Sequence, residues 1–224
     1  MRTRMIHGSI VLLMAGLLTG CAARVIDDSQ LQYLAPEFTV ESLSDHGLSL
    51  LPVVAGQGQE GLRRPLAAKL EAHLSSHLPE GRFLGAIETL DLLNEANLTE
   101  AYAQMIDDYS RAAILNKKTL HRIGQATGIR YLLHVKLLDQ SRTERIQQAF
   151  LSDNLVSLEG KNVSIFGQVW DCGLGDVVWE GTGQVNAEAE VEFQYVKQDI
   201  DQLVTMAAQS FLNNLPGIKL PPTN

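Results

Sequence analysis

Two alternating segments joined by a glycine-containing turn constrain the fold of this chain most. They run from Asn162 to Trp170 and from Val177 to Val185, on either side of Asp171–Asp176. So short a connection joins antiparallel neighbours, because parallel strands need a crossover of a dozen or more residues. The segments therefore predict a β-hairpin, which a doubly wound fold built only from strand–helix–strand units would not contain.

Upstream of this hairpin, short apolar runs alternate with segments of helical periodicity, which indicates an α/β domain. The predicted strands are 48–54, 83–87 and 131–138, and the predicted helices are 61–78, 88–96, 99–113, 117–127 and 195–212. The first strand is nearly all apolar, so it is expected to be buried on both faces. Pro52 lies within it and predicts a bulge or an edge position there.

The second strand of the hairpin continues beyond Val185 with strict alternation as far as Phe193. Its polar positions include Glu188, Glu190 and Glu192. A solvated face is the ordinary explanation of such a stripe, and a partner-binding edge is the alternative. These three glutamates are therefore the candidate partner edge of the chain.

The N-terminus has the pattern of a bacterial lipoprotein signal. Arg2 and Arg4 precede an uncharged run that ends in the lipobox Leu18-Thr19-Gly20-Cys21. The run is too short to remain as a membrane span. Cleavage before Cys21 would leave that residue carrying diacylglycerol and a further acyl chain such as palmitate, enough for stable anchoring. Ala22, rather than Asp, follows the cysteine, which favours the outer membrane. An ordinary signal peptide with a chance cysteine is the alternative.

The predicted organisation is a signal peptide at 1–20, a lipidated N-terminus and tether at 21–47, one α/β domain at 48–213 and a C-terminal tail at 214–224. Residues 1–20 hold two of the 18 Lys and Arg and none of the 26 Asp and Glu, so the mature chain has a net charge of −10. This sign disfavours nucleic acid and anionic lipid headgroups as partners. The predicted membrane contact is therefore the acyl anchor alone.

Gly56–Gly61 matches G-x-G-x-x-G, the fingerprint of dinucleotide-binding sites. The motif follows a predicted strand and opens a helix, and Glu88 ends the next strand. Glu60, however, puts a carboxylate where a pyrophosphate would meet the helix N-terminus. Glu88 also comes 27 residues after Gly61, whereas the usual spacing is about 20. A nucleotide-dependent enzyme using this loop is therefore an alternative only, and no cofactor is predicted.

Histidine and cysteine residues supply no stronger candidate. His73 and His77 are four apart on one predicted helix without a third ligand nearby, so burial or capping is expected rather than metal binding. His134 is expected either to face solvent or to be a polar group of the core. Acylation of Cys21 would leave Cys172 unpaired. A structural residue of the hairpin turn is the expected role of Cys172, and a reactive or intermolecular thiol is the alternative. No catalytic or metal-ligating residue is predicted.

Several motifs fall in an order that resembles a known superfamily. They are Leu51-Pro52-Val53-Val54, then Ile123–Gly128 followed by Ile129–Val135, and finally Val169-Trp170-Asp171 with Gly175–Glu180. Behind a lipobox, this order resembles the periplasmic anticodon-binding-like lipoprotein superfamily, which includes the LpoB-type penicillin-binding-protein activators, the curli secretion lipoprotein and the N-terminal domain of TolB. The resemblance covers about residues 48–213. It implies a three-layer α/β fold with a mixed sheet of about five strands and flanking helices, no tRNA binding and an adaptor role.

The sequence thus predicts a non-catalytic binding or assembly component on the periplasmic face of the outer membrane of a Gram-negative bacterium. Its envelope partner is unidentified, and a homo-oligomer stays open. An oligomeric secretion pore of the curli type is an alternative, against which charged residues in 139–160 and the lack of a clean partner strand for the stripe at 185–193 both count. A tether from Cys21 to Leu48 would reach roughly 90–100 Å when extended, which favours partners near the outer membrane.

Overall fold

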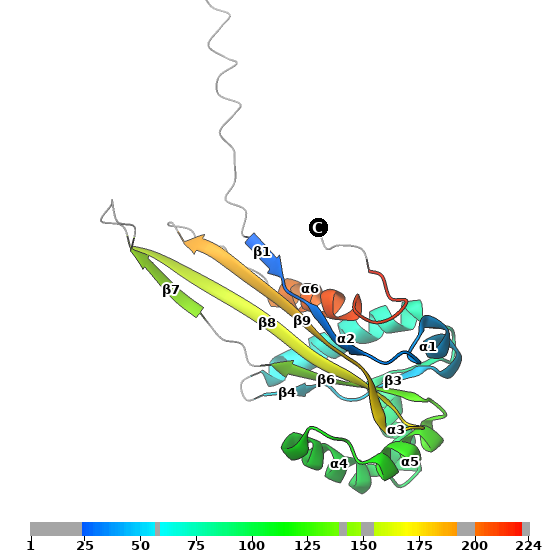
Figure 1. The fold of residues 1–224 in the computed structure, drawn as a ribbon. Coiled ribbons are helices and arrows are strands. Elements are labelled where there is room, and N and C mark those ends of the chain that lie inside the picture. Colours follow the sequence, from blue (N-terminus) through cyan, green and yellow to red (C-terminus); the bar gives the residue numbers. More distant parts are fainter. Residues whose placement is uncertain (1–23, 57–58, 139–142, 149–154, 192–199, 221–224) are drawn as a thin grey trace, which may run out of the picture.

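The computed structural model describes residues 24–56, 59–138, 143–148, 155–191 and 200–220. Within these residues, one sheet of nine strands is flanked by helices (Figure 1). The strands are β1 (Arg24–Asp27), β2 (Gln30–Leu34), β3 (Leu48–Leu50), β4 (Val54–Ala55), β5 (Phe83–Leu84), β6 (Tyr131–Leu138), β7 (Thr143–Gln148), β8 (Leu155–Asp171) and β9 (Asp176–Val191). The helices are α1 (Val40–His46), α2 (Glu60–His77), α3 (Ala86–Glu95), α4 (Thr99–Ala112), α5 (Lys117–Thr127) and α6 (Ile200–Leu212).

The sheet is mixed, as expected. Strands β3 and β4 run parallel to β6, and β3 also runs parallel to β5, whereas β8 runs antiparallel to both β6 and β9. The order along the main path is β1-β9-β8-β6-β3-β5, with β2 beside β9, β4 beside β6 and β7 beside β8. The predicted α/β fold is confirmed. The sheet is larger than the five strands expected, because β1, β2 and β7 add to it and the predicted strand 48–54 forms two strands, β3 and β4.

Pro52 produces the predicted bulge. Leu50 pairs with Leu133 and Val54 pairs with Lys136, so four steps along the first strand lie opposite three steps along β6. The extra residue falls in the stretch that contains Pro52, where a ladder hydrogen bond is missing in any case. The predicted strand 48–54 is therefore observed as two short strands, β3 and β4.

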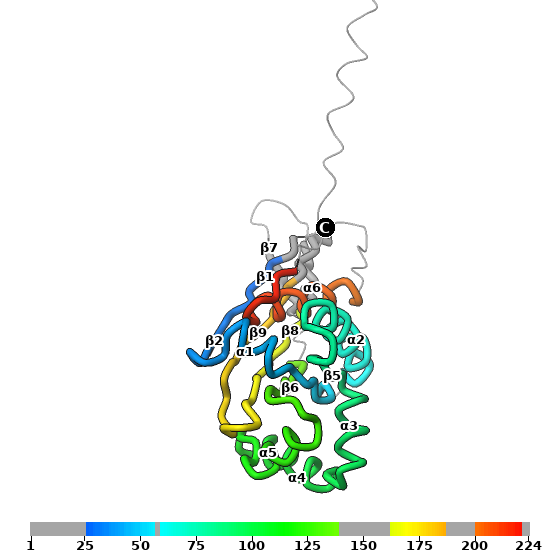
Figure 2. The backbone as a smooth tube through the Cα atoms, turned by 90° about the vertical axis from the view of Figure 1, so that its right-hand side faces the viewer, coloured from blue at the N-terminus to red at the C-terminus, as the bar shows by residue number. Residues whose placement is uncertain are grey.

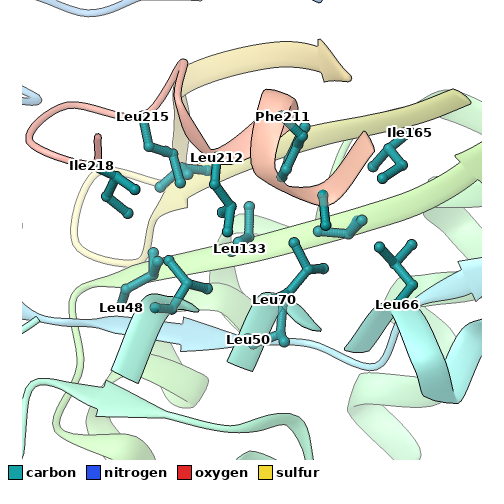
Figure 3. Packing of buried hydrophobic residues seen from close by; sticks show 14 of the residues in the cluster. Leu48, Leu50, Leu66, Leu70, Leu133, Ile165, Phe211, Leu212, Leu215 and Ile218 are labelled. Atoms are coloured by element: carbon teal, nitrogen blue, oxygen red, sulfur yellow. The ribbon is translucent and has the colours of Figure 1, made fainter. Parts of the chain in front are cut away.

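The two faces of the sheet carry separate buried clusters. On one face, Leu70 of α2 and Phe211 of α6 pack against β6, β8 and β9 (Figure 3). On the other face, Leu120 of α5 packs with Trp170 of β8, together with residues of α3 and α4. Helices thus cover both sides of the sheet, which makes the three layers visible in Figure 2.

Helix α6 approaches the sheet closely because two glycines face it. A Cβ atom on Gly183 would come within 2.5 Å of Phe211 Cβ and 2.6 Å of the Ala207 carbonyl oxygen. A Cβ atom on Gly167 would come within 2.4 Å of Phe211 Cζ. Glycine in a strand interior often marks such a close approach.

The predicted tether is wrong for most of its length, because residues 24–46 are folded onto the domain. Strands β1 and β2 pair antiparallel with β9, and α1 follows them. Phe38 is buried, and Thr39 caps α1 by accepting a hydrogen bond from the Ser42 amide at 3.1 Å. The folded domain therefore already includes Arg24, whereas Leu48 was its expected start. Strand β9, with which β1 and β2 pair, lies far away in the sequence, so local periodicity gave little indication of these two strands.

Residues 214–220 of the predicted C-terminal tail pack on the core instead. Leu215, Ile218 and Leu220 are buried in the cluster under α6 (Figure 3 labels the first two). The Leu220 amide donates to Asn213 Oδ1 at 2.7 Å, which holds the segment in place. Three apolar residues spaced by two or three positions among Pro216 and Gly217 do not form a regular period, so the sequence pattern did not reveal their burial.

The long strand at the end of the hairpin has a partner strand, contrary to expectation. Ser157–Asn162 of β8 pairs with Asn186–Val191 of β9, and β7 pairs with the other edge of β8. Figure 1 shows these strands extending beyond α6 as an arm. Among the described residues, no helix is long and apolar enough to cross a membrane.

Candidate partner-binding surfaces

The N-terminal strand is attached to the sheet and to α6. β1 pairs with β9 from Arg24, opposite Glu188, to Asp27. The Ser210 hydroxyl of α6 donates to the Asp27 carboxylate, and the Ser29 hydroxyl donates to the same carboxylate at 2.8 Å. The Asp28 amide donates to the Gln184 carbonyl at 3.0 Å. These contacts hold the beginning of the domain three residues after Cys21, which itself lies outside the described residues.

Strand β2 is an open edge with apolar side chains. Among the described residues, β1 and β2 pair only with β9, so their outer backbone groups face away from the sheet. Leu31, Tyr33 and Leu34 are 47%, 48% and 43% exposed. An exposed apolar edge strand is a template for pairing with another chain. Sequence reasoning missed this surface because it assigned the segment to the tether, although apolar residues at 31, 33 and 34 were a weak strand signal.

The candidate acidic edge is only partly an edge. Glu188 pairs with Gly160 of β8 on one side and with Arg24 of β1 on the other, so its backbone lies inside the sheet. Glu190 pairs with Leu158 of β8 and lies past the end of β1. Glu192 lies outside the described residues. Among the described residues, the open edge of the sheet at this side is therefore made by β1 and β2.

The glycine motif is engaged in local structure. Gln59 is buried and donates from Nε2 to the Leu138 carbonyl at 2.8 Å, which ties the start of α2 to the end of β6. Residues 57–58 lie outside the described part. Glu88 caps α3, since its Oε2 accepts a hydrogen bond from the Gly85 amide at 3.1 Å. The carboxylate that a ribose would require is thus used to satisfy a helix N-terminus.

The two histidines of α2 act locally. His77 Nδ1 donates to the His73 carbonyl at 2.8 Å, close to the helix end. His77 is exposed and His73 is half-buried, so neither is buried in the core. Partial burial, and then the neighbouring His77 and Lys69, lower the pKa of His73. Within the described ranges, no group of three or more His, Cys, Asp or Glu side chains is arranged to hold a metal ion.

A buried polar cluster lies between α4 and the sheet. His134 is 1% exposed, and the ring of Tyr109 packs edge-to-face on it at 4.4 Å between centroids. The Tyr109 hydroxyl donates to Gln168 Oε1 at 2.8 Å, and Gln168 Nε2 donates to Glu180. His134 is therefore a polar group of the core, one of the two roles expected for it. Burial, and then Lys136, lower its pKa to about 4.

A groove of about 520 Å³ runs beside α5, at the end of the molecule where the hairpin turns. It is lined by His121, Gly124, Gln125, Gly128, Arg130 and Gly173, among others. Arg130 contacts Asp171 Oδ2 at 2.7 Å, while Asp171 Oδ1 accepts from the Gly173 amide at 2.7 Å. Burial alone would raise the pKa of Asp171, but these bonds outweigh it and hold the pKa below its ordinary value. The turn is thereby kept in one conformation.

Cys172 is an inert structural residue of this turn. It is 3% exposed, and burial, followed by the charge of Asp171, raises the pKa of its thiol to about 12. Its carbonyl accepts a hydrogen bond from His121 Nδ1. A Cβ atom on Gly124 would come within 2.7 Å of Cys172 Cβ, so α5 packs directly on it. A thiol that stays protonated has no nucleophilic role.

No protein-family model matches the chain, and no curated protein matches its sequence. Among solved structures, it is similar to the PelC dodecamer from Paraburkholderia phytofirmans, with 12% identity, a TM-score of 0.44 and coverage of 88% of this chain and 100% of that chain. It is also similar to lipoprotein GNA1162 from Neisseria meningitidis, with 12% identity, a TM-score of 0.38 and coverage of 71% and 90%. A minor lipoprotein from Acinetobacter baumannii has 14% identity, a TM-score of 0.33 and coverage of 78% and 97%. Similarities of this size carry no argument about function.

Proposed function

We propose that the protein is a lipoprotein of the outer membrane, acylated on Cys21 and facing the periplasm, that acts as a non-catalytic binding or assembly component of the envelope. One observation carries the proposal: β1 begins at Arg24, three residues after the predicted acylation site, and is already paired with β9. Three residues span at most about 11 Å. Acyl chains on Cys21 would therefore hold the folded domain directly at the membrane surface.

This attachment suits a component that works beside its own membrane. The long tether expected from the sequence would have allowed the domain to reach partners far from the anchor. Because residues 24–46 are folded onto the domain, its reach from Cys21 is short. The resemblance to the periplasmic anticodon-binding-like lipoprotein superfamily supports the same adaptor role. A domain fixed near the bilayer meets its partners at the membrane or in the adjacent periplasm.

The open edge formed by β1 and β2 is the surface on which we place the partner. Leu31 and Leu34 are exposed beside unpaired backbone groups, a combination that favours addition of a strand from another chain. Backbone hydrogen bonds would supply affinity there, and the apolar side chains would supply specificity.

Photo-cross-linking in cells tests this role. A photoreactive residue at position 31 should capture a defined envelope protein repeatedly, and the same residue at position 87, where Ile87 is 74% exposed at the start of α3, should not. Capture of the same mixture from both positions, or of nothing from position 31, would remove the β2 edge as the partner surface.

A homo-oligomer is the second candidate, favoured by the same edge. Two copies could pair their β2 strands and cover Leu31, Tyr33 and Leu34 together. Native mass spectrometry in detergent should then show an assembly that Leu31→Lys/Leu34→Lys converts to monomer. If the wild type is monomeric at all concentrations, the β2 edge does not mediate self-association, and its partner is a different protein.

A further inference from the structure

Basic residues are concentrated in one segment of this acidic chain. The chain has 26 Asp and Glu, yet none of them lies between residues 109 and 138. That segment carries Arg111, Lys117, Lys118, Arg122, Arg130 and Lys136. Most of it forms α5 and β6 and the turns around them. A local basic region within a chain of net charge −8 creates a field opposite in sign to that of the rest of the molecule.

Three of these charges are uncompensated at the surface of α5. Lys117, Lys118 and Arg122 are exposed, and within the described ranges none of them forms an ion pair. Arg130 differs, because its charge is balanced by the buried Asp171. Asp176 is an exposed carboxylate on the neighbouring turn, so the surface keeps an excess of positive charge.

The charged surface borders the groove beside α5. His121, Gly124 and Gln125 line the groove from the same helix that carries Lys118 and Arg122. The stem of Lys117 lies over the hairpin turn, because a Cβ atom on Gly175 would come within 2.3 Å of Lys117 Cγ. The groove volume of about 520 Å³ is in the range of sites that accept small ligands or segments of a peptide.

The position of α5 in the molecule argues against a lipid surface as the occupant. β9 pairs with β1 at Glu188, near the anchor, and reaches the hairpin turn at Asp176. The twelve residues between these points span roughly 40 Å of strand. Figure 1 accordingly shows β1 and α5 at opposite ends of the molecule. This separation is several Debye lengths at physiological salt, so headgroups at the anchoring membrane would not reach the basic surface.

We propose that α5 and its groove bind an acidic polypeptide segment of an envelope partner. Its carboxylates would lie on Lys117, Lys118 and Arg122, and its backbone would enter the groove. This inference rests on the proposed assembly role and deepens it, since it gives the envelope partner a second contact at the end of the molecule away from the β1 and β2 edge. A concave site bordered by point charges favours a flexible chain with spaced carboxylates over a flat charged surface.

Fluorescence anisotropy with the full chain, purified from membranes in detergent, tests the proposal. The probe is a labelled peptide of alternating Glu and Gly residues. The charge reversal Lys118→Glu/Arg122→Glu should weaken its binding by about tenfold or more at low salt. The matched control is Arg63→Glu/Arg64→Glu, which changes the net charge equally at two exposed arginines of α2. The control should leave affinity within about twofold, and bound peptide should slow hydrogen exchange in 117–130 and 172–175.

Three results would overturn the proposal. One is equal weakening by both reversals, which would mean that only overall charge matters. Another is absence of peptide binding at low salt. The third is tighter binding, at the same residues, of an anionic polysaccharide or of vesicles containing anionic lipid. Since the assay needs no acylation, Cys21→Ser should bind the peptide as the wild type does, so failure here is distinguishable from failure of the lipoprotein assignment.

Discussion

His134 is a buried histidine whose two ring nitrogens have no hydrogen-bond partner among the described residues. Its position on β6, between Leu133 and Val135 in a strand buried on both faces, explains the burial. The sequence left two roles open for it, because a strand without alternation does not show which face a polar residue occupies. The buried imidazole of His134 therefore stays uncharged and without hydrogen bonds within the described residues.

This environment predicts that His134 makes stability depend on pH. Its pKa is about 4 in the folded chain and about 6.5 when unfolded. Between these values the unfolded state binds the extra proton, so stability is complete above pH 6.5 and falls by up to about 3 kcal/mol as the pH approaches 4. His134→Leu should flatten this decline and leave stability at pH 7 unchanged or higher, since it removes unpaired polar atoms.

Urea denaturation at a series of pH values measures the effect. The matched control is His46→Gln, which removes an exposed imidazole. A decline of equal steepness in wild type and His134→Leu would show that other groups cause it.

Gly183 is predicted to be indispensable to the packing of α6. Gly183→Ala should lower stability by about 1–3 kcal/mol, because the new methyl group meets the Ala207 carbonyl oxygen and Phe211. Gly61→Ala in α2 is the control, since a Cβ atom there has nothing within 4 Å and alanine favours the helix by about 0.5–1 kcal/mol. Thermal unfolding compares the two. A Gly183→Ala variant as stable as wild type would contradict the close approach.

At the scale of elements, strands and helices with a clear period were predictable. The strand at 131–138 and the helix at 117–127 are observed at the predicted positions, as β6 and α5. Strands β1 and β2 were not, because they pair with β9, more than 140 residues away, and one of their two edges is solvated. Pattern reasoning identifies elements by local periodicity, whereas short edge strands are stabilised by a distant partner.

Hydrogen exchange distinguishes a folded segment 24–35 from a tether. The amides of Asp28 and Ala35 donate to the carbonyls of Gln184 and Val178 at 3.0 and 2.8 Å. Both should exchange far more slowly than an unstructured chain, because their exchange requires the segment to detach from β9. If both amides exchange at the rate of a free peptide, residues 24–35 form an unstructured tether.

The C-terminal segment is predicted to contribute to the stability of the core. Ile218→Ala should lower the free energy of unfolding by about 2–4 kcal/mol, because Ile218 is buried under α6. Lys219→Ala, at the exposed neighbouring position, should change it by less than about 0.5 kcal/mol. Equal effects of the two substitutions in chemical denaturation would mean that the segment is not packed.

At the scale of the whole molecule, the candidate surfaces could not be predicted from the sequence. The β2 edge fell within the supposed tether, and the basic residues of α5 were hidden by the net acidic charge of the chain. Both surfaces depend on which segments the fold brings to one edge or one end. The lipobox, by contrast, is a local sequence motif that is recognisable without the fold. The structure adds that Cys21 lies three residues before β1, a strand paired with β9, and not before a long flexible linker.

Mass spectrometry of the protein purified from outer membranes shows whether Cys21 is the acylated N-terminus. We expect an N-terminal peptide that begins at Cys21 and carries three acyl chains, and loss of acylation together with release from the membrane in Cys21→Ser. An N-terminus at any other residue, or a Cys21 without acyl chains in the wild-type protein, would mean that this domain is not held at the membrane through Cys21.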